Sequence, residues 1–161
     1  MKTITIETVV KVYAYHELTA DEQKLAEAAR EATRRSYAPY SRFHVGSAVL
    51  LANGTVITGT NQENVAYPSG LCAERTTLFY ANSQYPDVAV KMLAIAACDA
   101  NGKMQSTPIS PCGACRQVMV ETEKRFKHPI RILLCGTEEV YVAENTSCLL
   151  PLSFNFTTES R

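Results

Sequence analysis

The sequence predicts an α/β protein with a three-layer α/β/α arrangement, in which a mixed sheet of about five strands lies between helices on both faces. Segments with strand and helix patterns alternate along the 161 residues. Residues 88–98, "VAVKMLAIAAC", form a nearly unbroken apolar run, as expected for a strand buried on both faces. We find no repeat, linker or low-complexity segment, and the length suits a single domain covering residues 1–161.

A strand and a helix are expected first. The β-branched residues of 4–15 favour a strand. In residues 18–36, Thr19 precedes Glu22 by the spacing of a capping box. The apolar residues that follow recur with the helical period and predict an amphipathic helix: Leu25, Ala28, Ala29 and Ala32.

A turn and a hairpin come next. Pro39 disfavours helix at the residue before it, so residues 36–43 are expected to form a turn. Residues 43–61 contain two strand-like runs on either side of Asn53 and Gly54. The Asn-Gly pair is a strong signal for a β-hairpin.

The second half of the chain continues the alternation around the buried strand 88–98. We expect two more helices, two more strands and a short closing helix or turn: residues 71–82, 111–126, 130–135, 139–144 and 146–154. Residues 99–110 are polar and indicate a loop. Because helices precede and follow the buried strand, the pattern favours a sheet that is covered on both faces.

Composition excludes several classes of function. Lys and Arg number 16 and so do Asp and Glu, giving a formal net charge of zero, so there is no general attraction to nucleic acid or to anionic membranes. No apolar run approaches the roughly 20 residues of a membrane span, and the first residues lack the pattern of a signal peptide. We therefore expect a cytoplasmic protein without a nucleic-acid or membrane partner.

The cysteine positions point to a metal site. In a reducing compartment, six cysteines are expected to be buried thiols or ligands, not disulfides. Cys112 and Cys115 lie one helical turn apart at the predicted start of one helix, and Cys72 lies at the start of another. A helix N-terminus stabilises thiolates, so these three residues predict a zinc site.

The number of ligands separates a catalytic from a structural zinc site. A structural site has four protein ligands, whereas a catalytic site keeps one position for water. The other cysteines lie in apolar segments, where thiols commonly act as small hydrophobic groups, and no histidine has a partner at a useful spacing: Cys98, Cys135, Cys148, His16, His44 and His128. We therefore expect three protein ligands and one open position.

Glu74 lies two residues after Cys72. Its carboxylate can lean over the open position, take a proton from water and pass it to a substrate nitrogen, which contributes about 10²–10⁴-fold in rate. The simpler alternative is a glutamate that complements the helix dipole, with a contribution below ~1 kcal/mol. Because a Pro-Cys-x-x-Cys sequence follows downstream, we favour the proton-transfer interpretation of Glu74.

These motifs resemble those of the cytidine deaminase family, specifically its small homotetrameric form. The zinc deaminase signature is Cys- or His-x-Glu followed by Pro-Cys-x-x-Cys. Five segments resemble the family in the same order, so that the likeness covers about residues 18–154: "YAPYSRFHVGSAVL" (37–50), "TGTNQENVAYPSG" (58–70), "CAER" (72–75), "PCGACRQV" (111–118) and "LLPLSF" (149–154). Ser47, Val65 and Thr77 stand where the family more usually has alanine.

The resemblance implies a fold, an activity and an assembly. It implies a cytidine deaminase-like fold with one Zn²⁺ per subunit held by Cys72, Cys112 and Cys115. The implied reaction is hydrolytic deamination of cytidine and deoxycytidine to uridine and deoxyuridine plus ammonia, in pyrimidine salvage, with Glu74 as the proton shuttle. The implied assembly is a homotetramer with its active sites near subunit interfaces.

The resemblance also implies a set of substrate contacts. Phe43 would pack against the pyrimidine, and Asn61 and Glu63 would hydrogen-bond the ribose 3′-hydroxyl. Ala73 would also contact the substrate, Tyr40 would lie near a subunit interface, and Phe154 would reach the base in a neighbouring subunit's site. Taken without the family, Phe43 would more simply be a core residue, and Asn61 and Glu63 would be the polar end of a strand.

Arg75 has a role that follows from charge. Three thiolates exceed the charge of Zn²⁺ and leave the site negative, which weakens the metal as a Lewis acid. A guanidinium group hydrogen-bonded to two of the sulfurs would offset this charge. The alternative is an arginine on the solvated face of the helix.

Related deaminases and a structural zinc module would show different sequence features. A deoxycytidylate deaminase should carry His-Ala-Glu and basic groups for a 5′-phosphate, and a blasticidin-type deaminase would not need the sequence "NQEN". Polynucleotide deaminases usually require a basic channel. A structural zinc module, which has no turnover, predicts a fourth protein ligand and tolerance of Glu74→Ala.

Overall fold

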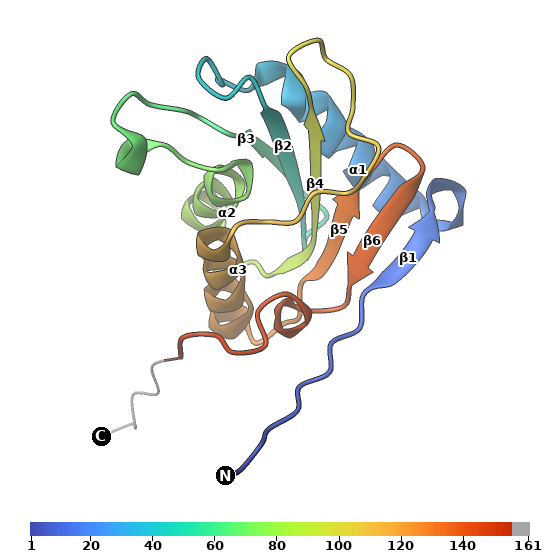
Figure 1. Cartoon of the computed structure of the whole chain (residues 1–161), viewed down its shortest axis with the longest axis vertical. Coiled ribbons are helices and arrows are strands. Elements are labelled where there is room, and N and C mark those ends of the chain that lie inside the picture. Colours follow the sequence, from blue (N-terminus) through green and yellow to red (C-terminus); the bar gives the residue numbers. More distant parts are fainter. Residues whose placement is uncertain (156–161) are drawn as a thin grey trace.

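Six strands form one mixed sheet in the computed structural model, which describes residues 1–155 (Figure 1). The strand order is β1-β6-β5-β4-β2-β3. β4 and β5 are parallel and joined through α3, whereas the other neighbours are antiparallel. The strands are β1 (Lys11–Ala14), β2 (His44–Leu51), β3 (Val56–Thr60), β4 (Val90–Cys98), β5 (Arg131–Cys135) and β6 (Glu139–Ala143).

Within residues 1–155, three α-helices and four short 3₁₀ helices accompany the sheet. The α-helices are α1 (Ala20–Ala32), α2 (Ala73–Gln84) and α3 (Gly113–Phe126). The 3₁₀ helices are η1 (Tyr15–Glu17), η2 (Thr33–Arg35), η3 (Tyr67–Ser69) and η4 (Thr146–Cys148). No helix within residues 1–155 combines the length and the apolar character that crossing a membrane would need.

The helices cover both faces of the sheet, which confirms the predicted three-layer α/β/α class. α1 packs on one face, where Leu25 and Ala29 meet Ala94 of β4. α2 and α3 lie on the opposite face, where Leu78 and Met119 join a second apolar cluster (Figure 1). β4 is buried from both sides, as its unbroken apolar sequence predicts.

The N-terminal strand is much shorter than predicted. A strand is expected over residues 4–15, but only Lys11–Ala14 forms β1, and residues 1–10 are exposed and lack regular structure. The register gives the physical reason: Lys11 lies opposite Val142, and β6 ends one residue later at Ala143. Residues before Lys11 therefore have no neighbouring strand to supply hydrogen bonds. The sheet has six strands where about five are expected from the alternating pattern.

Local signals in the sequence are confirmed at two positions. The Thr19 side chain accepts a hydrogen bond from the Glu22 backbone, and the Glu22 carboxylate accepts from the Thr19 backbone, which completes the capping box. The hairpin turns at Asn53 and Gly54, where Gly54 has a φ of 86°. A left-handed φ costs glycine little, so this residue permits the tight turn.

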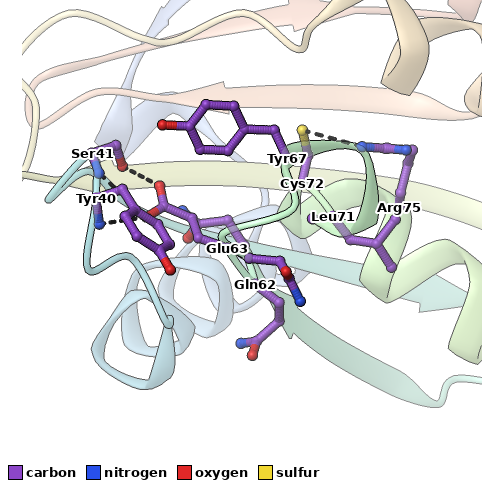
Figure 2. A pocket seen from close by; sticks show the side chains of 11 residues that line it. Tyr40, Ser41, Gln62, Glu63, Tyr67, Leu71, Cys72 and Arg75 are labelled. Atoms are coloured by element: carbon purple, nitrogen blue, oxygen red, sulfur yellow. Dashed lines mark hydrogen bonds between the residues drawn. The ribbon is translucent and has the colours of Figure 1, made fainter.

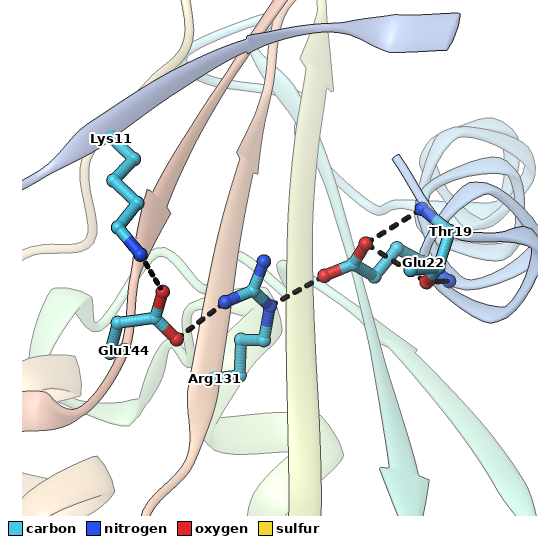
Figure 3. A network of polar contacts seen from close by, with 5 residues as sticks. All are labelled: Lys11, Thr19, Glu22, Arg131 and Glu144. Atoms are coloured by element: carbon cyan, nitrogen blue, oxygen red, sulfur yellow. Dashed lines mark hydrogen bonds and ion pairs between the residues drawn. The ribbon is translucent and has the colours of Figure 1, made fainter. Parts of the chain in front are cut away.

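A chain of ion pairs ties α1 to the β1 edge of the sheet (Figure 3). Arg131 of β5 donates from Nε to the buried Glu22 carboxylate at 2.5 Å and from Nη1 to Glu144, just after β6. Glu144 also accepts from Lys11 Nζ at 2.8 Å. Burial opposes the ionisation of Glu22, but the hydrogen bonds from Thr19 and Arg131 outweigh it and lower its pKa below 4.5.

Acid should weaken the fold through this network. Because the pKa of Glu22 is lowered in the folded state, its stabilisation is present above the unfolded carboxyl value and is lost as pH falls through the folded value. Hydrogen bonds from Arg131 and Lys11 lower the pKa of Glu144 in the same way. Glu22→Gln should reduce the free energy of unfolding at pH 7 by ~2 kcal/mol and flatten its decline below about pH 4.5, measured by urea unfolding between pH 3 and 7.

Glu31→Gln is the matched control for this experiment. Glu31 pairs with Arg34 on the surface of α1, and both side chains are more than half exposed. Exposed pairs contribute at most ~1 kcal/mol. Equal losses of stability in the two variants would show that the buried position of Glu22 has no special importance.

Candidate active site

Two α-helices begin with a cysteine at neighbouring positions in space. Cys72 is the N-cap residue of α2, and Cys112 is the N-cap residue of α3. Neither cysteine side chain makes a capping hydrogen bond, so both sulfurs are free for other use. Cys115 lies in the first turn of α3 and is buried. The positive ends of both helix dipoles therefore point to the same place, which favours thiolates there.

The three sulfurs have the spacing of a zinc site. Cys112 Sγ lies 3.7 Å from Cys72 Sγ and 3.4 Å from Cys115 Sγ. Zinc–sulfur bonds of about 2.3 Å in a tetrahedron place two sulfurs about 3.8 Å apart. All three ligand atoms lie within 4.8 Å of one another. The residues present therefore fit three corners of a zinc tetrahedron.

No fourth protein ligand joins this cluster within residues 1–155. Cys98 and Cys135 are buried thiols at the ends of β4 and β5, and Cys148 is partly buried in η4. His16, His44 and His128 also lie outside the cluster. Within the described residues the cluster therefore offers three protein ligands, the number typical of a catalytic zinc site.

Charge around the sulfurs supports a thiolate at Cys72. Hydrogen bonding from the Cys115 thiol and the nearby Arg75 guanidinium lower the pKa of Cys72 to about 5, against the opposing effect of burial. The pKa of Cys115 is raised, because its proton is held by the hydrogen bond to Cys72. Arg75 Nη2 donates to Cys72 Sγ at 3.9 Å (Figure 2). Burial opposes the charge of Arg75, but hydrogen bonding and charge attraction to Cys72 and Cys115 raise its pKa, so the guanidinium acts on two of the sulfurs.

Glu74 lies in the first turn of α2, on the buried side of the helix. It is 4% exposed, and burial raises the pKa of its carboxyl group, with the neighbouring Cys72 thiolate acting in the same direction. A raised pKa brings the carboxyl group closer to the range in which it can both accept and return a proton near neutral pH. Ala73 beside it is buried completely.

A cavity of about 490 Å³ opens next to Cys72. This volume lies within the range of small-molecule sites. Four of the predicted site residues line the cavity with Cys72: Tyr40, Asn61, Glu63 and Arg75. Figure 2 shows Tyr40, Glu63, Cys72 and Arg75 around it. Side chains from between residues 40 and 75 of the sequence therefore meet at one opening beside the metal cluster.

Hydrogen bonds to the loop before β2 and to the start of β2 hold two of the polar side chains that line the cavity, Glu63 and Asn61. Glu63 accepts from the backbone N–H groups of Tyr40 at 2.9 Å and Ser41 at 3.2 Å, and from the Ser41 hydroxyl. The Ser41 hydroxyl is the largest cause of a lowered pKa at Glu63. Asn61 accepts from Val45 N at 2.8 Å and donates to Phe43 O at 2.9 Å.

Other predicted residues lie outside the lining of this cavity. Phe43 is partly buried next to it, and Ala73 and Glu74 are buried in α2. Phe154 is 75% exposed and lies beside α3, where its backbone exchanges hydrogen bonds with the Gln117 side chain. Within one chain, Phe154 is therefore not part of the cavity.

Sequence reasoning missed two residues that shape the site. Tyr67 lines the cavity and packs edge-on against Tyr40, with ring centroids 6.3 Å apart. Arg116 donates to Pro111 O and to Leu149 O, both at 2.8 Å, and so fixes the loop that carries Cys112. An available signal was that both lie inside segments already singled out, 58–70 and 111–118.

Gly59 allows α2 to lie close to β3. A Cβ atom at this position would lie 2.4 Å from Thr77 Oγ1 and 2.8 Å from the Thr77 backbone nitrogen. Gly59→Ala should therefore displace α2, lower the free energy of unfolding by ~1–3 kcal/mol and weaken zinc binding, because Cys72 begins this helix. The measurements are thermal unfolding and a zinc titration with a competing chelator.

Gly113→Ala provides the control for this prediction. Gly113 lies in the first turn of α3, and a Cβ atom there meets open space. The free energy of unfolding of Gly113→Ala should stay the same or rise slightly, because alanine reduces the entropy of the unfolded chain. Unchanged zinc affinity in Gly59→Ala would mean that the position of Cys72 does not depend on how closely α2 packs against β3.

The fold and site together define a metal-binding α/β enzyme with a ligand cavity beside the metal position. A family model described as the cytidine and deoxycytidylate deaminase zinc-binding region matches residues 19–127. The chain belongs to this family of cytidine and deoxycytidylate deaminases, and its metal is zinc. The three-cysteine cluster and the matched zinc-binding region agree on the cofactor.

Individual relatives agree with the family match. A cytidine deaminase of Halalkalibacterium halodurans is 45% identical over 101 residues, which are 63% of this chain and 71% of the relative. One of Sporosarcina psychrophila is 46% identical over 101 residues, covering 63% and 69%. The crystal structure of cytidine deaminase from Burkholderia pseudomallei is 35% identical, with a TM-score of 0.70 and coverage of 85% of this chain and all of that one (100%).

Proposed function

We propose that the protein catalyses hydrolytic deamination of cytidine and deoxycytidine to uridine and deoxyuridine, releasing ammonia. The observation that carries this proposal is the three-cysteine cluster at the edge of a cavity that also holds Asn61 and Glu63. A metal cluster alone fits many hydrolases, and a polar sugar contact alone fits many binding proteins. Their placement in one cavity, together with relatives named cytidine deaminase, supports a nucleoside substrate.

Glu74 would serve as the proton carrier. When bound, zinc held by Cys72, Cys112 and Cys115 supplies Lewis acidity, which makes water more acidic. Glu74 would accept a proton from water and deliver it to N3 of the base while the remaining hydroxide adds to C4. It would then take the proton of the new C4 hydroxyl and pass it to the amino group, so that the C4–N bond breaks and ammonia leaves. The raised pKa of Glu74 suits this double role, since the group must accept and release a proton twice.

The cavity favours a nucleoside over a nucleotide. Glu63 would accept a hydrogen bond from the 3′-hydroxyl, and its negative charge would repel a 3′-phosphate. Arg75 is the cationic side chain among the residues that line the cavity, and it already donates to Cys72. A 5′-phosphate would therefore find no free cation there. Phe43 and Ala73 would contact the pyrimidine, and Asn61 would join Glu63 at the sugar.

We also propose that the protein forms a homotetramer and works in cytoplasmic pyrimidine salvage. Residues 1–161 would form one domain, of which residues 156–161 lie outside the part of the chain that the structure describes. Tyr40 is 51% exposed at the rim of the cavity, and Phe154 is exposed. Such exposed aromatic residues suit burial by neighbouring subunits, where Phe154 would complete another subunit's site. A reducing compartment suits the free cysteines, because oxidation would remove the thiolate ligands.

The direct test is ammonia release from four compounds by zinc-loaded protein. Cytidine and deoxycytidine should turn over, whereas cytidine monophosphate and free cytosine should react slowly. Turnover of the monophosphate alone would contradict the assigned sugar contacts. No turnover of either nucleoside by protein carrying one zinc per chain would refute the proposed function. Sedimentation analysis of the same sample tests the tetramer separately.

A further inference from the structure

We propose that Ser41 is a positioning residue for nucleoside binding, because its hydroxyl group holds the Glu63 carboxylate and the Phe43 backbone at the same time. The inference rests on the proposed function and refines how the same site recognises the sugar. Ser41 itself lines the cavity, but its hydroxyl group already donates to Glu63 and accepts from Phe43. Its importance would therefore lie in arranging two other residues.

The first half of this arrangement is the carboxylate of Glu63. Its Oε2 accepts from the backbone N–H groups of Tyr40 and Ser41, at 2.9 Å and 3.2 Å. Its Oε1 accepts from the Ser41 hydroxyl (Figure 2). A carboxylate offers about four lone-pair directions. With three already occupied, the carboxylate has room for about one further donor, which suits a single sugar hydroxyl.

The second half is the backbone of Phe43. Its N–H donates to the Ser41 hydroxyl oxygen at 3.1 Å, and its carbonyl accepts from the Asn61 side chain at 2.9 Å. Because the hydroxyl oxygen receives the Phe43 N–H, the hydroxyl proton is directed to Glu63. One hydroxyl thus connects the residue proposed for the sugar with the residue proposed for the base.

The backbone around Ser41 is held independently of its side chain. Tyr37 N donates to Asn61 O at 3.1 Å, and Glu63 N donates to Tyr37 O at 2.9 Å. Arg42 has a left-handed φ of 54°, and its N–H donates to Ala38 O at 3.0 Å, closing the turn. Removing the hydroxyl should therefore leave the loop in place and release only the hydrogen bonds that orient Glu63 and Phe43.

The test compares Ser41→Ala, Ser41→Thr and wild type on cytidine and on 3′-deoxycytidine. Loss of one hydrogen bond to a charged group should raise the KM of Ser41→Ala for cytidine by about tenfold, with kcat unchanged within about twofold. The KM for 3′-deoxycytidine should rise by only about twofold, because this substrate lacks the hydroxyl that Glu63 receives. Threonine keeps a hydroxyl group and should restore the KM for cytidine.

Product binding and a distant serine complete the design. Calorimetric titration with uridine should show the same weakening in Ser41→Ala, independent of turnover. Ser83→Ala, at an exposed position on α2, should match wild type in every measurement. Zinc content and melting temperature confirm that each variant is folded.

The outcomes separate the two proposals. A wild-type protein inactive on every nucleoside would refute the proposed function and this inference with it. If wild type is active, an unchanged KM in Ser41→Ala would refute the role of Ser41 alone. An equal rise in KM for cytidine and 3′-deoxycytidine would also overturn it, since Ser41 would then not act through the sugar contact of Glu63.

Discussion

Replacing Glu74 with glutamine should lower kcat for cytidine by about 10²–10⁴-fold, the typical contribution of a positioned general acid–base group. Glutamine has nearly the same shape but cannot take up or release the proton. The structure makes this substitution informative, because Glu74 is buried, belongs to the helix that begins at Cys72 and has a raised pKa. Steady-state ammonia release gives kcat, and metal analysis should still find one zinc per chain.

Glu121→Gln is the matched control. Glu121 lies on the exposed side of α3, so its loss should leave kcat unchanged within about twofold. If Glu74→Gln kept more than about a tenth of the wild-type kcat with zinc in place, proton transfer through Glu74 would be excluded as a major source of rate. A structural zinc module predicts this tolerance and also predicts that wild type has no turnover.

Replacing Cys115 with alanine should remove both zinc and activity. Its sulfur is buried and lies 3.4 Å from Cys112 Sγ, and within residues 1–155 the metal cluster has no further member beyond the three cysteines. Two thiolates hold zinc much more weakly than three, and we expect metal analysis to fall from about one zinc per chain to near zero after dialysis. The stabilisation that bound zinc gives, ~4 kcal/mol when zinc is present at a thousand times its Kd, would be lost as well.

Cys98→Ala separates ligand loss from loss of a buried thiol. Cys98 is buried at the end of β4 and lies outside the metal cluster. This variant should bind zinc and deaminate cytidine as wild type does, even if its melting temperature falls slightly. Loss of zinc from Cys98→Ala, or retention of zinc by Cys115→Ala, would contradict the assignment of ligands. X-ray absorption at the zinc edge should show three sulfur neighbours in wild type.

Local sequence patterns were sufficient wherever the determining interaction lies within a few residues. The capping box of Thr19 and Glu22 and the turn at Asn53 and Gly54 are set by neighbours in the chain, and both formed as predicted. The apolar run of β4 also predicted correctly that this strand is buried. The strand expected over residues 4–15 was wrong for most of its length, because β propensity cannot show where a partner strand ends.

The candidate site divides in the same way. Cys112 and Cys115 could be paired from the sequence, because one helical turn places them on the same side of α3. That Cys72 joins them depends on how α2 and α3 pack, across 40 residues of chain. From the sequence, Cys72 could be grouped with them only because it too lies at a predicted helix start; that the two helix starts meet is a result of the packing. Gly59 permits the close packing of α2, but no local sequence pattern indicates this role.

By itself, the sequence determined the α/β class, the helix starts that carry the cysteines, and a charge balance that gives no general attraction to nucleic acid. These properties follow from periodicity, capping and composition, which are local or additive. Only the tertiary structure decided the shape of the cavity, the burial that raises the pKa of Glu74, and the convergence of Ser41, Glu63 and Phe43. Each of these depends on distances between segments far apart in the chain, and those distances are set by packing on the sheet.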